Sequence, residues 1–106
     1  MSTRDEKITG ILRDLGARFL TLNGNGSSLL TVTKAELTRN EKCATIFFTV
    51  FPDKFEKTAL EFAKRKRSEF KEFVKENGML GKIPQMDFQI DLEEKNRQKI
   101  DELLKE

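Results

Sequence analysis

The chain contains no histidine, tyrosine or tryptophan, and it has one cysteine and two prolines among 106 residues. The lone cysteine, Cys43, cannot form an intramolecular disulfide, and without histidine it has no imidazole to serve as its general base. The same lack removes the histidine and cysteine patterns of zinc sites. We therefore expect no enzyme activity, no metal or other cofactor, and no small-molecule substrate.

Long apolar runs are also absent. Residues 1–10 lack the apolar stretch of a signal peptide, and no segment reaches the roughly 18 apolar residues that indicate a membrane helix. We expect a cytoplasmic protein with no membrane partner. A reducing compartment agrees with a free thiol, and we expect Cys43 to be an inert cysteine packed within an apolar strand.

The composition suits one small domain, residues 1–106. Charged residues make up 36% of the chain and hydrophobic residues 37%, with nine phenylalanines to fill one core. Residues 1–52 contain seven basic and five acidic side chains, residues 53–90 nine and seven, and residues 91–106 four and six, so only the last segment is acidic. The run KRKR, residues 64–67, is the only run of four like charges, and such a run on a helix is most often a solvated face.

Hydrophobic periodicity predicts six elements in the order α-β-β-α-β-α. Apolar residues at helical spacing indicate a helix over residues 3–22, which the asparagine- and glycine-rich loop NGNGSS ends. Residues 29–38 and 43–51 are rich in β-branched and aromatic side chains, and the four-residue link RNEK suits an antiparallel hairpin. Pro52 ends the second strand, and its alternation puts four apolar side chains on one face: Ala44, Ile46, Phe48 and Val50.

A long helix is predicted from Asp53 to near Gly78. Asp53 and Glu56 have the spacing of a capping box, and apolar residues then recur at helical spacing. We expect this stripe to pack in the core rather than to stack on bases; its members are Phe55, Ala59, Phe62, Ala63, Phe70, Phe73 and Val74.

The last two elements are a half-buried strand and a short helix. Met86, Phe88 and Ile90 alternate with polar residues and should share the core face of the strand. Asp91 and Glu94 repeat the capping spacing before a final amphipathic helix, whose apolar residues are Leu92, Ile100, Leu103 and Leu104. The pattern of all six elements is that of an α+β fold.

Three segments carry the pattern of a known family: LLTVTKAELTRNEKCATIFFTVFPD, GKIPQMDFQID and NRQKIDELLKE. The first holds a Thr/Val strand that leads through Leu37 into a hairpin with alternating aliphatics. The second holds a basic-Ile-Pro signature before a strand ending Phe-x-x-Asp, matched by Lys82, Ile83, Pro84, Phe88 and Asp91. The third meets a closing Ile-Asp-x-Leu-Leu theme, with Arg97 placed two residues early. Together they resemble bacterial ribosome-binding factor A.

The resemblance implies a KH-like (type II) domain in which a three-stranded sheet packs against helices. It implies a ribosome assembly factor that binds the small (30S) ribosomal subunit and assists late maturation and processing of 16S rRNA. In that family a helical kink marked Ala-x-Gly replaces the GxxG loop of RNA-binding KH domains. Lys66, Arg67 and Ser68 occupy these positions here, so we expect the long helix to bend at or near Ser68.

The candidate RNA-binding residues are basic, and most lie on the long helix: Lys64, Arg65, Lys66, Arg67, Lys71, Lys75 and Lys82. Lysine and arginine that neutralise phosphates gain affinity by releasing counterions, and a net charge of only +2 better suits docking on structured RNA than gripping naked duplex. Two alternatives are a KH-like module with another RNA target and a protein-interaction domain that uses the sheet or the acidic C-terminal helix. We find no long apolar surface stripe, and we expect a monomer.

Overall fold

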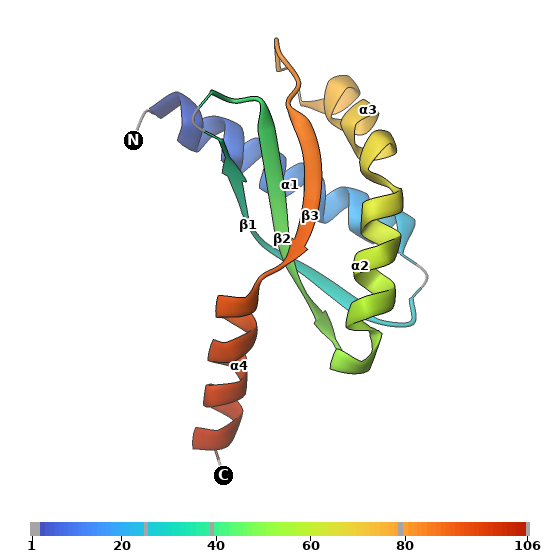
Figure 1. Cartoon of the computed structure of the whole chain (residues 1–106), viewed down its shortest axis with the longest axis vertical. Coiled ribbons are helices and arrows are strands. Elements are labelled where there is room, and N and C mark those ends of the chain that lie inside the picture. Colours follow the sequence, from blue (N-terminus) through green and yellow to red (C-terminus); the bar gives the residue numbers. More distant parts are fainter. Residues whose placement is uncertain (1–2, 25, 39, 79, 106) are drawn as a thin grey trace.

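The helices and strands follow the predicted order, except that the long central helix is divided in two (Figure 1). The computed structural model describes residues 3–24, 26–38, 40–78 and 80–105, so Asn25 of the first loop and Arg39 of the hairpin turn lie outside the described residues. The elements are α1 (Thr3–Asn23), β1 (Leu29–Leu37), β2 (Cys43–Phe51), the 3-10 helix η1 (Asp53–Phe55), α2 (Glu56–Arg65), α3 (Arg67–Asn77), β3 (Gln85–Ile90) and α4 (Leu92–Leu104).

The sheet is mixed and has the strand order β1-β2-β3. β1 and β2 form the predicted antiparallel hairpin, whereas β3 pairs in parallel with β2 and places Phe88 beside Ile46. Parallel neighbours need a crossover connection, which η1, α2 and α3 supply. The register of β1 shifts between Val32 and Lys34, so Thr33 lies in a bulge.

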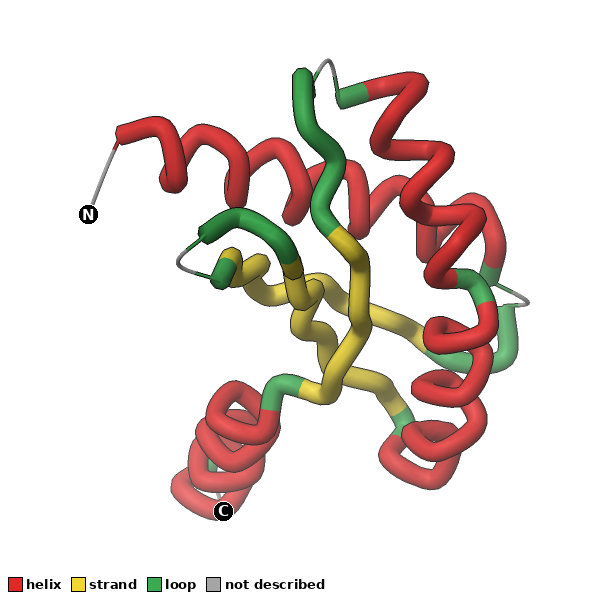
Figure 2. Tube along the Cα trace, turned by 45° about the horizontal axis from the view of Figure 1, so that its top comes forward, coloured by secondary structure: helices red, strands yellow, loops and turns green. Residues whose placement is uncertain are grey.

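One face of the sheet carries the hydrophobic core, against which α1, α2 and α3 pack (Figure 2). The alternation predicted for β2 is confirmed, because its four inward residues are at most 5% exposed. Phe88 of β3 is fully buried, and its ring centroid lies 5.2 Å from that of Phe70 and 6.3 Å from that of Phe48. The stripe of the central helix is confirmed as core: Ala59, Ala63, Phe70 and Val74 are buried, and Phe55, Phe62 and Phe73 pack against them.

The central helix bends at Lys66, where α2 and α3 meet and change direction (Figure 2). Lys66 has φ −95° and ψ 8°, outside the helical region, and its N–H is shared between the carbonyls of Phe62 and Ala63 at 3.2 and 3.1 Å. The predicted bend is confirmed, but it lies at the first residue of the Ala-x-Gly position rather than at Ser68. Because φ is negative, this bend does not require glycine.

Ser68 is therefore expected to tolerate glycine. Its side chain is exposed in the first turn of α3. Ser68→Gly should lower the free energy of unfolding by no more than about 0.5–1 kcal/mol, the helix-propensity cost of glycine. Urea denaturation of this variant beside Ser68→Ala measures the effect. A loss of several kcal/mol in both variants would mean that the serine hydroxyl maintains the bend.

The start of the central helix differs from its prediction. Pro52 occupies the N-cap position of η1 and offers no side-chain acceptor, and no side-chain hydrogen bond caps η1 or α2. The predicted capping box of Asp53 and Glu56 is therefore wrong. Glu56 instead forms an ion pair with Lys95 of α4, at 2.9 Å.

The start of α4 agrees with its prediction, but the surroundings of this helix do not. Asp91 caps α4, because its Oδ1 accepts the backbone N–H of Glu94 at 3.0 Å. Beyond this cap the helix projects from the end of the sheet (Figure 1), and none of its residues is buried. The apolar residues of α4 lie on the surface instead of in the core, since four of them are exposed: Leu92, Ile100, Leu103 and Leu104.

Candidate nucleic-acid interface

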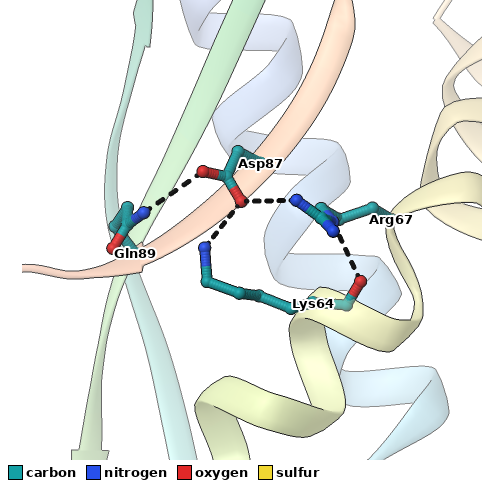
Figure 3. Close-up of polar contacts among 4 residues, drawn as sticks. All are labelled: Lys64, Arg67, Asp87 and Gln89. Carbon is teal, nitrogen blue, oxygen red and sulfur yellow. Dashed lines mark hydrogen bonds and ion pairs between the residues drawn. The ribbon is translucent and has the colours of Figure 1, made fainter.

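The bend brings two of the predicted basic residues onto one carboxylate. Lys64 Nζ lies 2.9 Å from Asp87 Oδ1, and a guanidinium nitrogen of Arg67 lies 3.4 Å from the same oxygen (Figure 3). Arg67 Nε also donates to the backbone carbonyl of Lys64 at 3.0 Å, and Gln89 donates to the other Asp87 oxygen at 3.1 Å. The cluster ties the end of α2 and the start of α3 to β3.

The carboxylate of this cluster is ionised at neutral pH. Partial burial by itself would raise the pKa of Asp87, but hydrogen bonds from Lys64, the Phe88 backbone and Gln89 outweigh burial and lower that pKa. A negative charge therefore persists between the two cations. Lys64 and Arg67 must share their positive charge with Asp87, which leaves less of it for an external phosphate.

A groove runs beside this cluster, between α3 and the starts of β2 and β3. It is lined by Cys43, Arg67, Ser68, Lys71, Gln85, Met86 and Asp87. Cys43 is exposed here, so the prediction of a packed cysteine is wrong. The reason is the strand alternation, because the register that buries Ala44 turns Cys43 to the other face of the sheet. Lys71 makes no ion pair with the described residues, and it is the free cation of this groove.

Arg65 and Lys66 do not belong to this groove. Arg65 points to a separate apolar cleft between α2 and the start of β1, which is lined by Gly24, Ser27, Ser28, Leu30, Phe55, Thr58, Ala59, Phe62 and Arg65. Lys66 Nζ pairs with Glu69 at 3.4 Å and lies 6.0 Å from the centroid of the Phe62 ring. The KRKR run is thus spread around the helix bend rather than gathered on one face.

Lys75 and Lys82 extend the positive charge toward the other end of α3. Both side chains are exposed and without an ion pair in the described part of the chain. Lys82 lies in one shallow groove with Lys42 and in a second with Arg4 and Lys7. No sequence pattern indicates that Lys42 and Lys7 lie near Lys82, because only tertiary contacts bring these residues together.

One backbone hydrogen bond explains the proximity of Lys42 and Lys82. The N–H of Gln85, the first residue of β3, donates to the carbonyl of Lys42 at 2.8 Å and fixes the β1–β2 turn beside the loop before β3. Arg4 is partly neutralised by Glu41, 3.3 Å away in the same turn. Among the described residues of this end, the lysines that make no ion pair are Lys7, Lys42 and Lys82.

This arrangement can attract phosphates, because its free lysines surround grooves on a mixed sheet. Such a geometry is suited to binding an extended anionic partner. The described residues contain no group of three or more side chains able to hold a metal ion. None of the described helices combines the length and apolar character needed to span a membrane.

Comparison with known families decides the assignment. A family model described as ribosome-binding factor A matches residues 4–104. The chain belongs to the ribosome-binding factor A family. This match confirms the resemblance of the three sequence segments, and membership of this non-catalytic family implies a role as a ribosome-binding factor.

Solved structures of ribosome-binding factor A show the same fold. The protein from Thermus thermophilus is 16% identical, with a TM-score of 0.72 over 81% of this chain and 93% of that chain. A Thermotoga maritima protein, provisionally described as a ribosome binding factor A, is 20% identical, with a TM-score of 0.55 over 80% of each chain. These matches confirm the predicted α+β, KH-like type II fold. A search of curated proteins gave no match.

Proposed function

We propose that the protein binds the small (30S) ribosomal subunit through 16S rRNA and assists late maturation of that RNA as a cytoplasmic, non-catalytic assembly factor. The observation that carries the proposal is the family match over residues 4–104. The free lysines along α3 and the neighbouring loops supply the chemistry, because each lysine that neutralises a phosphate releases counterions.

Within the proposed RNA-binding set, the residues have two roles. Lys71, Lys75 and Lys82 contact phosphates directly, since they are not paired with acids of the described chain. Lys64 and Arg67 hold the bend against β3 through Asp87, and so they position the groove in which Lys71 lies. Lys66 and Arg65 add positive charge on the other sides of the bend.

The mechanism follows from shape as well as charge. A net charge of +2 is too small to hold naked duplex tightly, so affinity should depend on an RNA surface that fits the bent helices and the strand edge. Binding would hold an immature region of 16S rRNA in one conformation, and the protein would leave when that region reaches its mature structure. Residues 1–106 would act as one domain in this role.

Removing two free lysines tests the proposed interface. Lys71→Ala combined with Lys75→Ala should weaken binding to small subunits about tenfold at moderate salt and lower the magnitude of the salt slope by somewhat less than ~2. Co-sedimentation with purified small subunits across a salt series measures both quantities. Because Lys75 is exposed, and Lys71 is half-buried beside the groove without an ion pair in the described chain, thermal stability should change little.

A charge-matched control separates local contacts from net charge. Lys57 and Lys105 are exposed and unpaired in the described chain, and they lie outside the groove. Lys57→Ala combined with Lys105→Ala removes the same charge and should leave the salt slope near that of the wild type. Equal slopes for the two double variants would contradict the assignment. Full competition by an unrelated structured RNA would instead favour a KH-like module with another target.

A further inference from the structure

Helix α4 presents an apolar side to water. Its exposed fractions are 64% for Leu92, 56% for Ile100, 70% for Leu103 and 79% for Leu104. These residues share one side of the helix. Leu92 and Leu103 are about three full turns apart, and Ile100 precedes Leu103 by three residues and Leu104 by four. Ile100, Leu103 and Leu104 form an exposed apolar patch near the end of α4, and Leu92 lies about two turns earlier on the same side. An exposed apolar patch on a projecting element is a common feature of interaction sites.

The base of α4 is held in place. Asp91 caps the helix and also accepts a hydrogen bond from the hydroxyl of Thr33, in the bulge of β1. One turn further on, Lys95 pairs with Glu56 of α2 at 2.9 Å, and Lys99 lies 4.0 Å from Asp53 of η1. These two ion pairs tie the first half of α4 to α2 and η1. The helix itself projects from the end of the sheet (Figure 1), and its four apolar residues stay more than half exposed in the described chain.

The charge of the helix limits what can cover the apolar side. Residues 91–106 contain six acidic and four basic side chains. Three of those basic residues are already paired, Lys95 and Lys99 with acids outside α4 and Arg97 with Glu94.

Beyond the capping Asp91, the acids left without an ion pair in the described chain are Glu93, Asp101 and Glu102. Glu93 shares the apolar side of the helix, because Ile100 follows it by seven residues. Phosphates would be repelled here, and so would the same acidic helix of a second copy, whereas a basic chain would be attracted.

We propose that the apolar side of α4 docks a basic, amphipathic segment of a ribosomal protein, which supplies apolar side chains for the leucines and lysine or arginine for the flanking acids. This inference rests on the proposed function, since the particle bound there is the small subunit. The protein would then bind its particle at two chemically opposite places. Basic grooves beside α3 would contact RNA, and the acidic helix α4 would contact protein.

The two contacts can be separated by comparing intact small subunits with protein-free 16S rRNA. Ile100→Gln combined with Leu103→Gln keeps helix propensity and changes only exposed side chains. This variant should bind small subunits about tenfold more weakly, as expected for loss of a central apolar contact, and bind free 16S rRNA as the wild type does. Gln98→Ala, on the polar side of the same helix, is the matched control and should change neither affinity.

Each outcome has a distinct consequence. Wild-type affinity of Ile100→Gln/Leu103→Gln for intact subunits would overturn the α4 proposal alone, and so would an equal loss of affinity for free 16S rRNA. If the wild-type chain binds neither subunits nor 16S rRNA, the proposed function itself fails.

A photo-crosslinking amino acid at position 103 in the full chain identifies the class of partner. The expected product on small subunits is a covalent adduct with one ribosomal protein, mapped by mass spectrometry to a lysine- or arginine-rich segment, and no such adduct from position 98. Crosslinking to rRNA, crosslinking to a second copy of the chain, or equal yields from both positions would overturn the proposal.

Discussion

Phe88→Ala is expected to lower the free energy of unfolding by about 3–5 kcal/mol, the usual cost of truncating a buried phenylalanine. Phe88 is fully buried on the middle of β3, and its ring packs between those of Phe48 and Phe70. The space left by alanine cannot close easily, because β2 on one side and α3 on the other are fixed by the sheet and the bend. A typical domain is held together by only about 5–15 kcal/mol, so much of the stability should be lost.

Thermal and urea denaturation measure this change. The matched control is Leu103→Ala, which removes an apolar side chain that is 70% exposed and should alter stability by less than about 0.5 kcal/mol. If Phe88→Ala melted like the wild type and nevertheless lost RNA binding, Phe88 would be a surface contact. The assignment of Phe88 to the core face of β3 would then be wrong.

Asp91→Ala is expected to cost about 2–3 kcal/mol, the sum of a lost N-cap near 1 kcal/mol and a lost hydrogen bond to a charged group of about 1.5 kcal/mol. The Asp91 side chain joins two elements, because it caps α4 and accepts the Thr33 hydroxyl from the bulge of β1. Its backbone N–H donates to the carbonyl of Phe48 at 2.8 Å, a bond that alanine would keep. The residue is only 6% exposed, so water cannot replace these partners. Urea denaturation of the wild type and of Asp91→Ala measures this difference in the free energy of unfolding.

The charge of Asp91 also predicts an acid-dependent loss of stability. Burial by itself would raise its pKa, but hydrogen bonds from Thr33 and Glu94, together with the charge of Lys34, outweigh burial and hold the pKa below the ordinary value of 3.8. Since the folded pKa is lower than the unfolded one, the carboxylate stabilises the fold fully above about pH 4. This contribution is lost as the pH falls through the folded pKa.

Asp91→Asn isolates that contribution. Asparagine can still cap the helix, but it does not titrate, so the variant should lose less stability than the wild type between about pH 4 and pH 2. Asp87 also has a lowered pKa and remains in both proteins, so the difference between the two profiles reports Asp91 alone. Parallel profiles would mean that the Asp91 carboxylate does not stabilise the folded state.

The order and type of the elements could be predicted because they depend on local patterns. The alternation in residues 43–51 predicted which side chains of β2 are buried, and the stripe from Phe55 to Val74 predicted the side of the central helix that packs. The Lys82-Ile83-Pro84 signature and the hairpin pattern were enough to indicate the family. Spacing along one chain suffices for such inferences, because it fixes which side chains share a face.

The site was only partly predictable, because charges pair with neighbours in space. KRKR looked like one basic surface in the sequence, but Asp87, a residue of another element, holds Lys64 and Arg67, while Arg65 faces a different cleft. In the same way, Lys42 joins Lys82 only because β3 pairs in parallel with β2. Strand pairing between distant segments leaves no periodic signal in either segment.

The sequence by itself therefore determined the six elements, the inward faces of the strands and central helix, and the family. Only the tertiary structure decided which cations are free, where the central helix bends, and whether the apolar side of α4 is covered. Once α1, α2 and α3 have packed against the inner face of the sheet, α4 begins just after Asp91 at the end of β3 and projects beyond that face. An amphipathic pattern predicts that a helix has an apolar side, but what covers that side depends on the surface remaining after the other elements have packed.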